Sequence, residues 1–172
     1  MGQPNARLLL KGKPFADEAT RAMFLAGLNE RGIGGERIQL VAWLPSATEH
    51  LALYEQIDVA LDPFPYNGTT TTCEALWMGV PVVTLNGDRH SARVGASLLT
   101  QIGMTDWVAR SVDDYIGIAL TLASDPANLQ QLRRGLRQKL ADSALCDGDS
   151  FAHKIEDAYR TIWRRWCEET HS

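Results

Sequence analysis

The residues best suited to chemistry stand in one short segment, where Asn67 and Gly68 precede four consecutive threonines, Thr69 to Thr72. Threonine hydroxyls donate hydrogen bonds to phosphate oxygens without adding a charge, and glycine lets a ligand approach the backbone closely. A helix that begins near Thr70 would add backbone N–H groups and a partial positive charge at the same place. The segment therefore predicts an anion site, and a diphosphate is the ligand that fits it best.

Glu74 follows these threonines at a spacing that puts it one helical turn from Thr70 and Thr71, on the same face. A carboxylate does not favour phosphates, but it accepts hydrogen bonds from the two hydroxyls of a ribose. The spacing Thr71-x-x-Glu74 also fits a capping box, in which both side chains satisfy N–H groups of the helix itself. Spacing alone leaves both interpretations open, and capping is the commoner use of such a pair.

Cationic residues also gather at the expected start of a later helix, where Arg89, His90 and Arg93 oppose the helix dipole. They are either tolerated for an anionic ligand or form a solvated turn, and the sequence favours neither. Lys11 and Lys13 follow the first apolar run and are expected to lie in solvent at a strand end.

Bulk composition excludes several classes of protein. The net charge of −4 argues against nucleic acid as a partner. No apolar run approaches the roughly 20 residues of a membrane span, and no signal peptide opens the chain, so a cytoplasmic location is expected. The three cysteines are dispersed, and neither a zinc spacing nor a serine-hydrolase motif occurs, so we expect no metal and no cofactor.

Short apolar runs alternate with helical spacing along most of the chain. Strands are expected at 7–11, 37–43, 57–61, 81–85 and 107–109, and helices at 15–31, 48–54, 70–78, 91–102, 113–123, 126–140 and 151–168. We expect Ser91 to cap one of these helices. The alternation predicts one α/β domain, residues 1–172, doubly wound around a mostly parallel sheet of about five strands with helices on both faces. Ligands of such sheets bind beyond the carboxyl ends of the strands, which here are the loops 44–48 and 62–69.

The run Glu74-Ala75-Leu76-Trp77-Met78-Gly79-Val80-Pro81 resembles the Glu-x-x-x-x-Gly-x-Pro motif of GT-B glycosyltransferases. More narrowly, the blocks 49–50, 61–68 and 87–97 resemble the C-terminal catalytic segment of O-GlcNAc transferase and SPINDLY-type proteins of the bacterial branch. Several blocks recur in order over nearly the whole chain. The resemblance implies the C-terminal Rossmann-like domain of a GT-B fold. It implies the UDP-binding part of an inverting, metal-independent enzyme that transfers N-acetylglucosamine from UDP to protein side chains.

The resemblance also implies roles for single residues. Thr70 and Thr71 would contact the β-phosphate and Glu74 the ribose hydroxyls, while His50 would lie against the uracil and the Leu44 backbone would read its edge. From the residues alone, His50 is a surface histidine near a helix start. The implied UDP-binding set is Leu44, His50, Asn67, Gly68, Thr69, Thr70, Thr71 and Glu74, with Arg89 and Arg93 as further candidates on the donor side.

The sequence departs from the animal enzymes of this family at two positions. They have a histidine where this chain has Thr69 and a basic residue where it has Leu53, so the identity of the donor sugar stays open. The catalytic lysine and the acceptor-side groups of the family are expected upstream of Arg7, on an N-terminal half with possible tetratricopeptide repeats, so no catalytic residue is assigned. The alternatives are another GT-B enzyme, such as a UDP-sugar epimerase, and a non-catalytic nucleotide-binding or interaction module.

An apolar stripe of the last helix is expected to pack in the core or to form an interface with the missing half: Ile155, Tyr159, Ile162, Trp163 and Trp166.

Overall fold

The computed structural model describes residues 5–170, which form two compact units, one ending at Asp58 and one beginning at Val59. Each unit contains its own parallel sheet, of two strands in unit 1 and of three strands in unit 2. The prediction of one domain stays a prediction, and the units are described separately. None of the helices within residues 5–170 combines the length and apolar character needed to cross a bilayer.

Unit 1 pairs two strands in parallel, β1 (Leu8–Lys11) and β2 (Ile38–Val41). The helix between them, α1 (Glu18–Asn29), begins after Asp17, whose carboxylate accepts a hydrogen bond of 2.7 Å from the Thr20 N–H. The second helix, α2 (Ala47–Ala52), follows Ser46, whose hydroxyl accepts from the Glu49 N–H at 3.4 Å. Side-chain caps of this kind satisfy N–H groups that have no partner within the helix.

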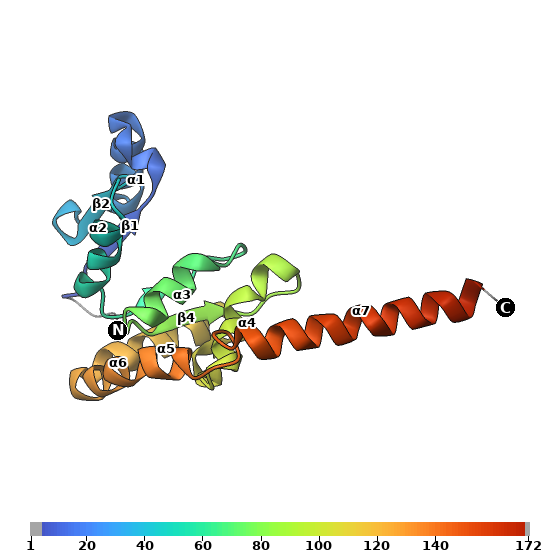
Figure 1. Ribbon diagram of the computed structural model, residues 1–172. Helices are drawn as coiled ribbons and strands as arrows, with labels where there is room; N and C mark the ends of the chain where they lie inside the picture. The colour runs from blue at the N-terminus through green and yellow to red at the C-terminus, as the bar shows by residue number, and fades with distance from the viewer. Residues whose placement is uncertain (1–4, 171–172) are drawn as a thin grey trace. The chain divides into compact units, whose positions relative to one another are not determined.

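Unit 2 has the strand order β3 (Ala60–Leu61), β4 (Val82–Leu85), β5 (Val108–Ala109). Three helices contact the central strand β4: α3 (Thr70–Trp77), α4 (Val94–Gln101) and α5 (Val112–Ser124). Figure 1 shows α3 on one side of β4 and α5 on the other. The next helix, α6 (Pro126–Ala141), contacts both α3 and α5.

The core of unit 2 surrounds β4, whose residues Val82, Val83 and Thr84 are almost fully buried. A strand covered on both faces is largely apolar, which is why this run lacks the alternation of a half-exposed strand, and its one polar side chain, Thr84, is hydrogen-bonded. Helices α3, α4 and α6 each contribute one leucine that is at most 1% exposed, namely Leu76, Leu99 and Leu136. The core thus fixes α3 against the sheet.

The α/β class and the parallel pairing are confirmed, although the five strands divide between two sheets rather than forming one. The expected strand 57–61 shortens to two residues, because only its end pairs with β4. The prediction that Ser91 caps a helix is wrong. Residues His90–Ala92 form a 3₁₀ turn, and Arg93 leaves helical geometry, so α4 begins only at Val94.

The last helix, α7 (Gly148–Thr170; red in Figure 1), has no buried residue. Its apolar side chains are 40–69% exposed, so the prediction that they pack in the core is wrong for the described residues. The Trp163 and Trp166 rings stack on one another with centroids 5.2 Å apart. Periodicity shows that a helix has an apolar side, but not what covers it.

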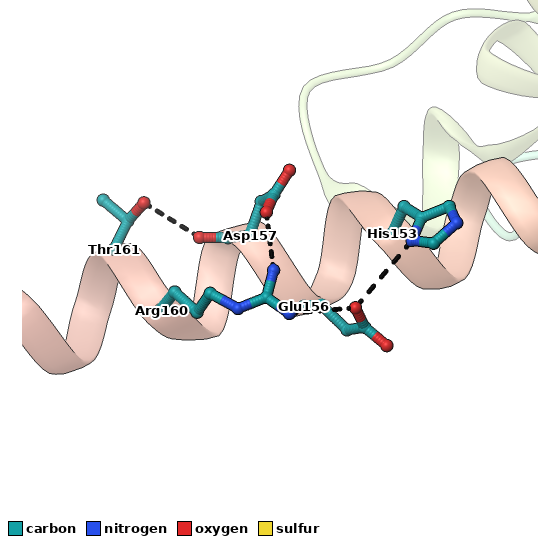
Figure 2. A network of polar contacts seen from close by, with 5 residues as sticks. All are labelled: His153, Glu156, Asp157, Arg160 and Thr161. Carbon is teal, nitrogen blue, oxygen red and sulfur yellow. Dashed lines mark hydrogen bonds and ion pairs between the residues drawn. The ribbon is translucent and has the colours of Figure 1, made fainter.

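Polar residues of α7 contact one another in a network drawn in Figure 2. Arg160 bridges Asp157 at 2.8 Å and Glu156 at 3.2 Å, and the Thr161 hydroxyl donates to the Asp157 carbonyl at 2.8 Å. His153 lies 3.8 Å from Glu156. Pairs at these spacings stabilise an exposed helix locally, by about 0.2–0.5 kcal/mol each.

Candidate functional site

The loop 62–69 connects the carboxyl end of β3 to the first turn of α3, at the sheet edge where parallel α/β folds bind ligands. Asp62 continues the strand, since its N–H donates to the Val83 carbonyl at 2.9 Å. Between Asp62 and Asn67, which are both buried, the residues of the loop are exposed. The loop is therefore held at both ends.

Helix α3 begins at Thr70, with Thr69 as its N-cap residue and no side-chain hydrogen bond at that cap. The first bond of the helical type runs from the Cys73 N–H to the Thr69 carbonyl at 3.1 Å, so the N–H groups of residues 70–72 precede it. Thr69, Thr70 and Thr71 are exposed, whereas Thr72 is buried. The predicted helix start is confirmed, and three exposed threonines lie at it.

A capping box would require Thr71 at the N-cap position, but Thr69 occupies that position and Thr71 already lies within the helix. The register therefore does not match the capping interpretation. Glu74 is half-buried and lies one turn along the helix from Thr70 and Thr71, as predicted. Its role at a ribose stays a prediction.

Gly68 contributes its N–H to the protein itself, in a hydrogen bond of 2.7 Å to Asp62 Oδ1. A Cβ atom at this position would lie 2.5 Å from Thr71 Oγ1 and 2.9 Å from Thr72 Oγ1, both too close. Glycine thus lets the loop approach the first turn of α3 without displacing these hydroxyls. The approach of a ligand to Gly68 stays a prediction.

Asn67 is 1% exposed and joins three segments of unit 2. Its Nδ2 donates to the Pro63 carbonyl at 3.1 Å, its Oδ1 accepts from the Gly95 N–H at 3.4 Å, and its own N–H donates to the Ser91 carbonyl at 2.8 Å. These bonds hold the loop against the start of α4. A direct contact of Asn67 with UDP stays a prediction.

Sequence reasoning missed the polar cluster beneath the loop, which consists of Asp62, Thr84 and Tyr115. Asp62 is 3% exposed, and its Oδ2 accepts a hydrogen bond of 2.7 Å from the Thr84 hydroxyl. The Tyr115 hydroxyl donates to the Asp62 main-chain carbonyl at 3.0 Å. A carboxylate directly after a buried strand was the available signal, but its partners lie far along the chain.

Burial governs the titration of this cluster. Desolvation raises the pKa of Asp62 above its ordinary value, although the hydrogen bonds from Thr84 and Gly68 oppose the rise. Burial and the nearby Asp62 charge raise the pKa of Tyr115 to about 12. Tyr115 therefore stays a neutral hydrogen-bond donor over the whole physiological range.

The predicted uracil-side residues, Leu44 and His50, belong to unit 1 and are both half-buried. His50 lies on α2, where its Nδ1 accepts a hydrogen bond from Lys11 Nζ. Its ring meets the Tyr54 ring edge-on, with centroids 5.7 Å apart. Lys11 is exposed at the end of β1, as expected, but it is engaged by this histidine. The roles of Leu44 and His50 at a base stay predictions.

Arg89 and Arg93 occupy the turn before α4. Arg93 donates through Nε to the Gly87 carbonyl at 2.8 Å, which stabilises the turn. Arg89 lies 3.8 Å from Asp88, and both side chains are more than 80% exposed. The contact of Arg93 supports a structural role for it, and a donor-side role of either arginine stays a prediction.

A parallel α/β unit with an exposed helix start at the carboxyl edge of its sheet has the arrangement with which Rossmann-like domains bind phosphates. Comparison with known families identifies the particular one: residues 2–155 match the model of glycosyl transferase family 41. The chain belongs to that family.

Several relatives are similar over 80% of this chain or more. A barley protein named "Probable UDP-N-acetylglucosamine--peptide N-acetylglucosaminyltransferase SPINDLY" is 46% identical over 96% of this chain. The Caenorhabditis elegans UDP-N-acetylglucosamine--peptide N-acetylglucosaminyltransferase is 31% identical over 80% of it. The solved structure of a Thermobaculum terrenum O-GlcNAc transferase mutant matches with a TM-score of 0.90 and 44% identity over 97% of this chain. The chain spans only 18% of the barley protein, 12% of the nematode protein and 32% of the solved bacterial chain.

Proposed function

We propose that this chain is the UDP-sugar-binding part of an inverting, metal-independent O-linked N-acetylglucosaminyltransferase that acts on protein side chains. The observation that carries the proposal is the exposed first turn of α3, with Thr69, Thr70 and Thr71 at the carboxyl edge of the sheet in a family 41 chain. The names of the relatives support the same donor and a peptide acceptor. They favour transfer over the sugar epimerisation that a GT-B fold could also host.

The proposed role of the site is to stabilise the departing UDP. Negative charge develops on the β-phosphate as the bond to the sugar breaks, and N–H groups and hydroxyls already oriented at that position stabilise the charge without rearranging. Thr70 and Thr71 carry the hydroxyls, and the first turn of α3 supplies the N–H groups. Glu74 lies one turn further along, where its carboxylate would accept hydrogen bonds from the ribose hydroxyls.

The chain supplies one wall of a transferase site. A single wall does not hold donor and acceptor together, so we expect the 172 residues alone to bind UDP weakly and to transfer nothing. The longer protein would contribute the base, the acceptor groups and, as the resemblance implies, tetratricopeptide repeats in a cytoplasmic enzyme. We propose that the exposed apolar side of α7 packs against that N-terminal half.

Calorimetric titration with UDP tests the donor site. Glu74→Ala removes hydrogen bonds to a charged group, so the affinity of this variant for UDP should fall by about 10-fold or more. The affinity of Thr71→Val for UDP should fall by about fivefold. Matched controls are Thr105→Val and Glu169→Ala, both exposed and outside the site. Unchanged affinity in Glu74→Ala and Thr71→Val would exclude the assignment. Repeating the titration with a chelator should leave the affinity unchanged if binding is metal-independent.

A non-catalytic nucleotide-binding module is the second candidate, because the chain alone contains no assigned catalytic residue. Such a module would give the same titration results. The two differ in the longer protein, where a transferase incorporates N-acetylglucosamine from labelled UDP-N-acetylglucosamine into protein acceptors and the module does not.

A further inference from the structure

Asp62, directly after β3, connects the loop 62–69 to the central strand β4 through a side chain that is 3% exposed. Oδ1 accepts from the Gly68 N–H and Oδ2 from the Thr84 hydroxyl, each at 2.7 Å. One carboxylate therefore fixes the distance between the central strand and the residue just before the threonine run. Both donors are neutral, so the carboxylate is held by hydrogen bonds alone.

Gly95 shows how closely α4 approaches the same carboxylate. A Cβ atom built there would collide with Asp62 Oδ2 and Thr84 Oγ1, and it would lie 2.9 Å from Thr84 Cβ. The Gly95 N–H also donates to Asn67 Oδ1. The start of α4 thus closes the space around Asp62 and Asn67, and both anchors of the loop depend on this glycine.

Burying a carboxylate among neutral donors costs free energy that a neutral or apolar side chain would not. The geometry indicates what the carboxylate does at this position. It turns the Gly68 N–H inward, towards the protein, so that the chain leaves the loop with residues 69–71 exposed at the start of α3. Without this acceptor, the Gly68 N–H would be unsatisfied or would turn to the surface.

We propose that Asp62 is a positioning residue for the diphosphate site: it fixes the backbone at Gly68, so that the first turn of α3 keeps its N–H groups and threonine hydroxyls aimed at the phosphates. This inference rests on the proposed function. It predicts that Asp62 contributes to the binding of the diphosphate but not to that of a phosphate-free nucleoside.

The test compares the affinities of the chain for UDP and for uridine, both by ligand-observed NMR titration. Asp62→Ala should lower the affinity for UDP by about 10-fold while changing that for uridine less than about twofold. In Asp62→Asn, the amide oxygen can still accept the hydrogen bond from the Gly68 N–H, and the amide NH₂ can donate to the Thr84 hydroxyl oxygen. The affinity of this variant for UDP should therefore lie within about threefold of that of the unsubstituted chain. The matched control is Asp106→Asn, which is exposed and outside the cluster.

Gly95→Ala perturbs the carboxylate from the other side and should also lower the UDP affinity selectively. If Asp62→Ala does not fold, the affinities of Asp62→Asn and Gly95→Ala for UDP test the proposal instead. An unchanged affinity of Gly95→Ala for UDP overturns it. A loss of UDP and uridine binding in equal measure overturns it as well, because it indicates a purely structural role. If the unsubstituted chain binds no UDP, the proposed function fails and this inference fails with it; if it binds and Asp62→Ala binds equally, only the inference fails.

Discussion

The Tyr115 hydroxyl donates a hydrogen bond of 3.0 Å to the main-chain carbonyl of Asp62, which joins α5 to the end of β3 across 53 positions of sequence. The Phe64 ring meets the Tyr115 ring edge-on, with centroids 5.5 Å apart. Helix α5 therefore supports the loop 62–69 through one polar and one aromatic contact. The loop that leads into the candidate phosphate site is thus held in place by a helix that lies far along the chain.

Tyr115→Phe should lower the free energy of unfolding by about 1 kcal/mol, because the Asp62 carbonyl loses its donor while the ring contacts remain. Urea unfolding followed by circular dichroism measures the change. Tyr159→Phe is the matched control, since that tyrosine is 69% exposed on α7 and should behave like the unsubstituted chain. Equal stability of both variants would contradict the buried hydrogen bond.

Stability should also fall steeply in alkaline solution because of the same residue. The unfolded chain releases the Tyr115 proton near its ordinary pKa of 10.0, whereas the folded chain holds it to about 12. The raised pKa stabilises the fold fully below pH 10, and this contribution is lost as the pH rises through about 12. Unfolding measured between pH 9 and 12 should therefore show a smaller decline for Tyr115→Phe, and an identical slope would refute the assignment.

Gly79→Ala should destabilise the chain by about 1–3 kcal/mol, because alanine is strained at positive φ and its Cβ has no room. The φ angle at Gly79 is +77°, and a Cβ atom there would lie 2.8 Å from the Arg133 carbonyl oxygen of α6. Gly135→Ala should have the opposite effect and stabilise the chain by about 0.5–1 kcal/mol, because alanine favours a helix interior more than glycine does. Gly135 lies inside α6, and nothing lies within 4 Å of the added atom. Thermal unfolding of both variants measures the contrast, and a similar loss in each would argue against it.

The features that the sequence predicts well are those with local causes. The loop ends at Asn67-Gly68 before the threonine run, and α3 ends just before Gly79 with its positive φ. The largely apolar run at β4 indicates a strand covered on both faces. Each cue lies within a few residues of its effect. The start of α3 and the α/β class follow from them.

Features that depend on distant partners could not be predicted in the same way. Asp62 meets Thr84 and Tyr115 only after the sheet and α5 are in place, so neither spacing nor residue type reveals the contact. Ser91 does not cap α4, because it lies inside the 3₁₀ turn His90–Ala92 and Arg93 leaves helical geometry before α4 begins. Tertiary context decides such cases.

Replacing both stacked tryptophans of α7 should separate folding from association. Trp163→Ser with Trp166→Ser removes side chains that are 63% and 53% exposed, so the free energy of unfolding of the isolated chain should change by less than about 0.5 kcal/mol. Leu136→Ala, by contrast, empties a site that is 1% exposed and should cost about 2–5 kcal/mol.

The same double variant should bind more weakly to the separately produced N-terminal part of the longer protein, because the apolar side of α7 is the proposed contact with it. Pull-down or calorimetry with that part measures the loss. Arg164→Ala is the matched control, since this residue is exposed on the opposite face of the helix and should bind normally. Destabilisation of the isolated chain as large as that of Leu136→Ala would show instead that the stripe packs within the chain. Unchanged binding by the double variant would place the contact elsewhere.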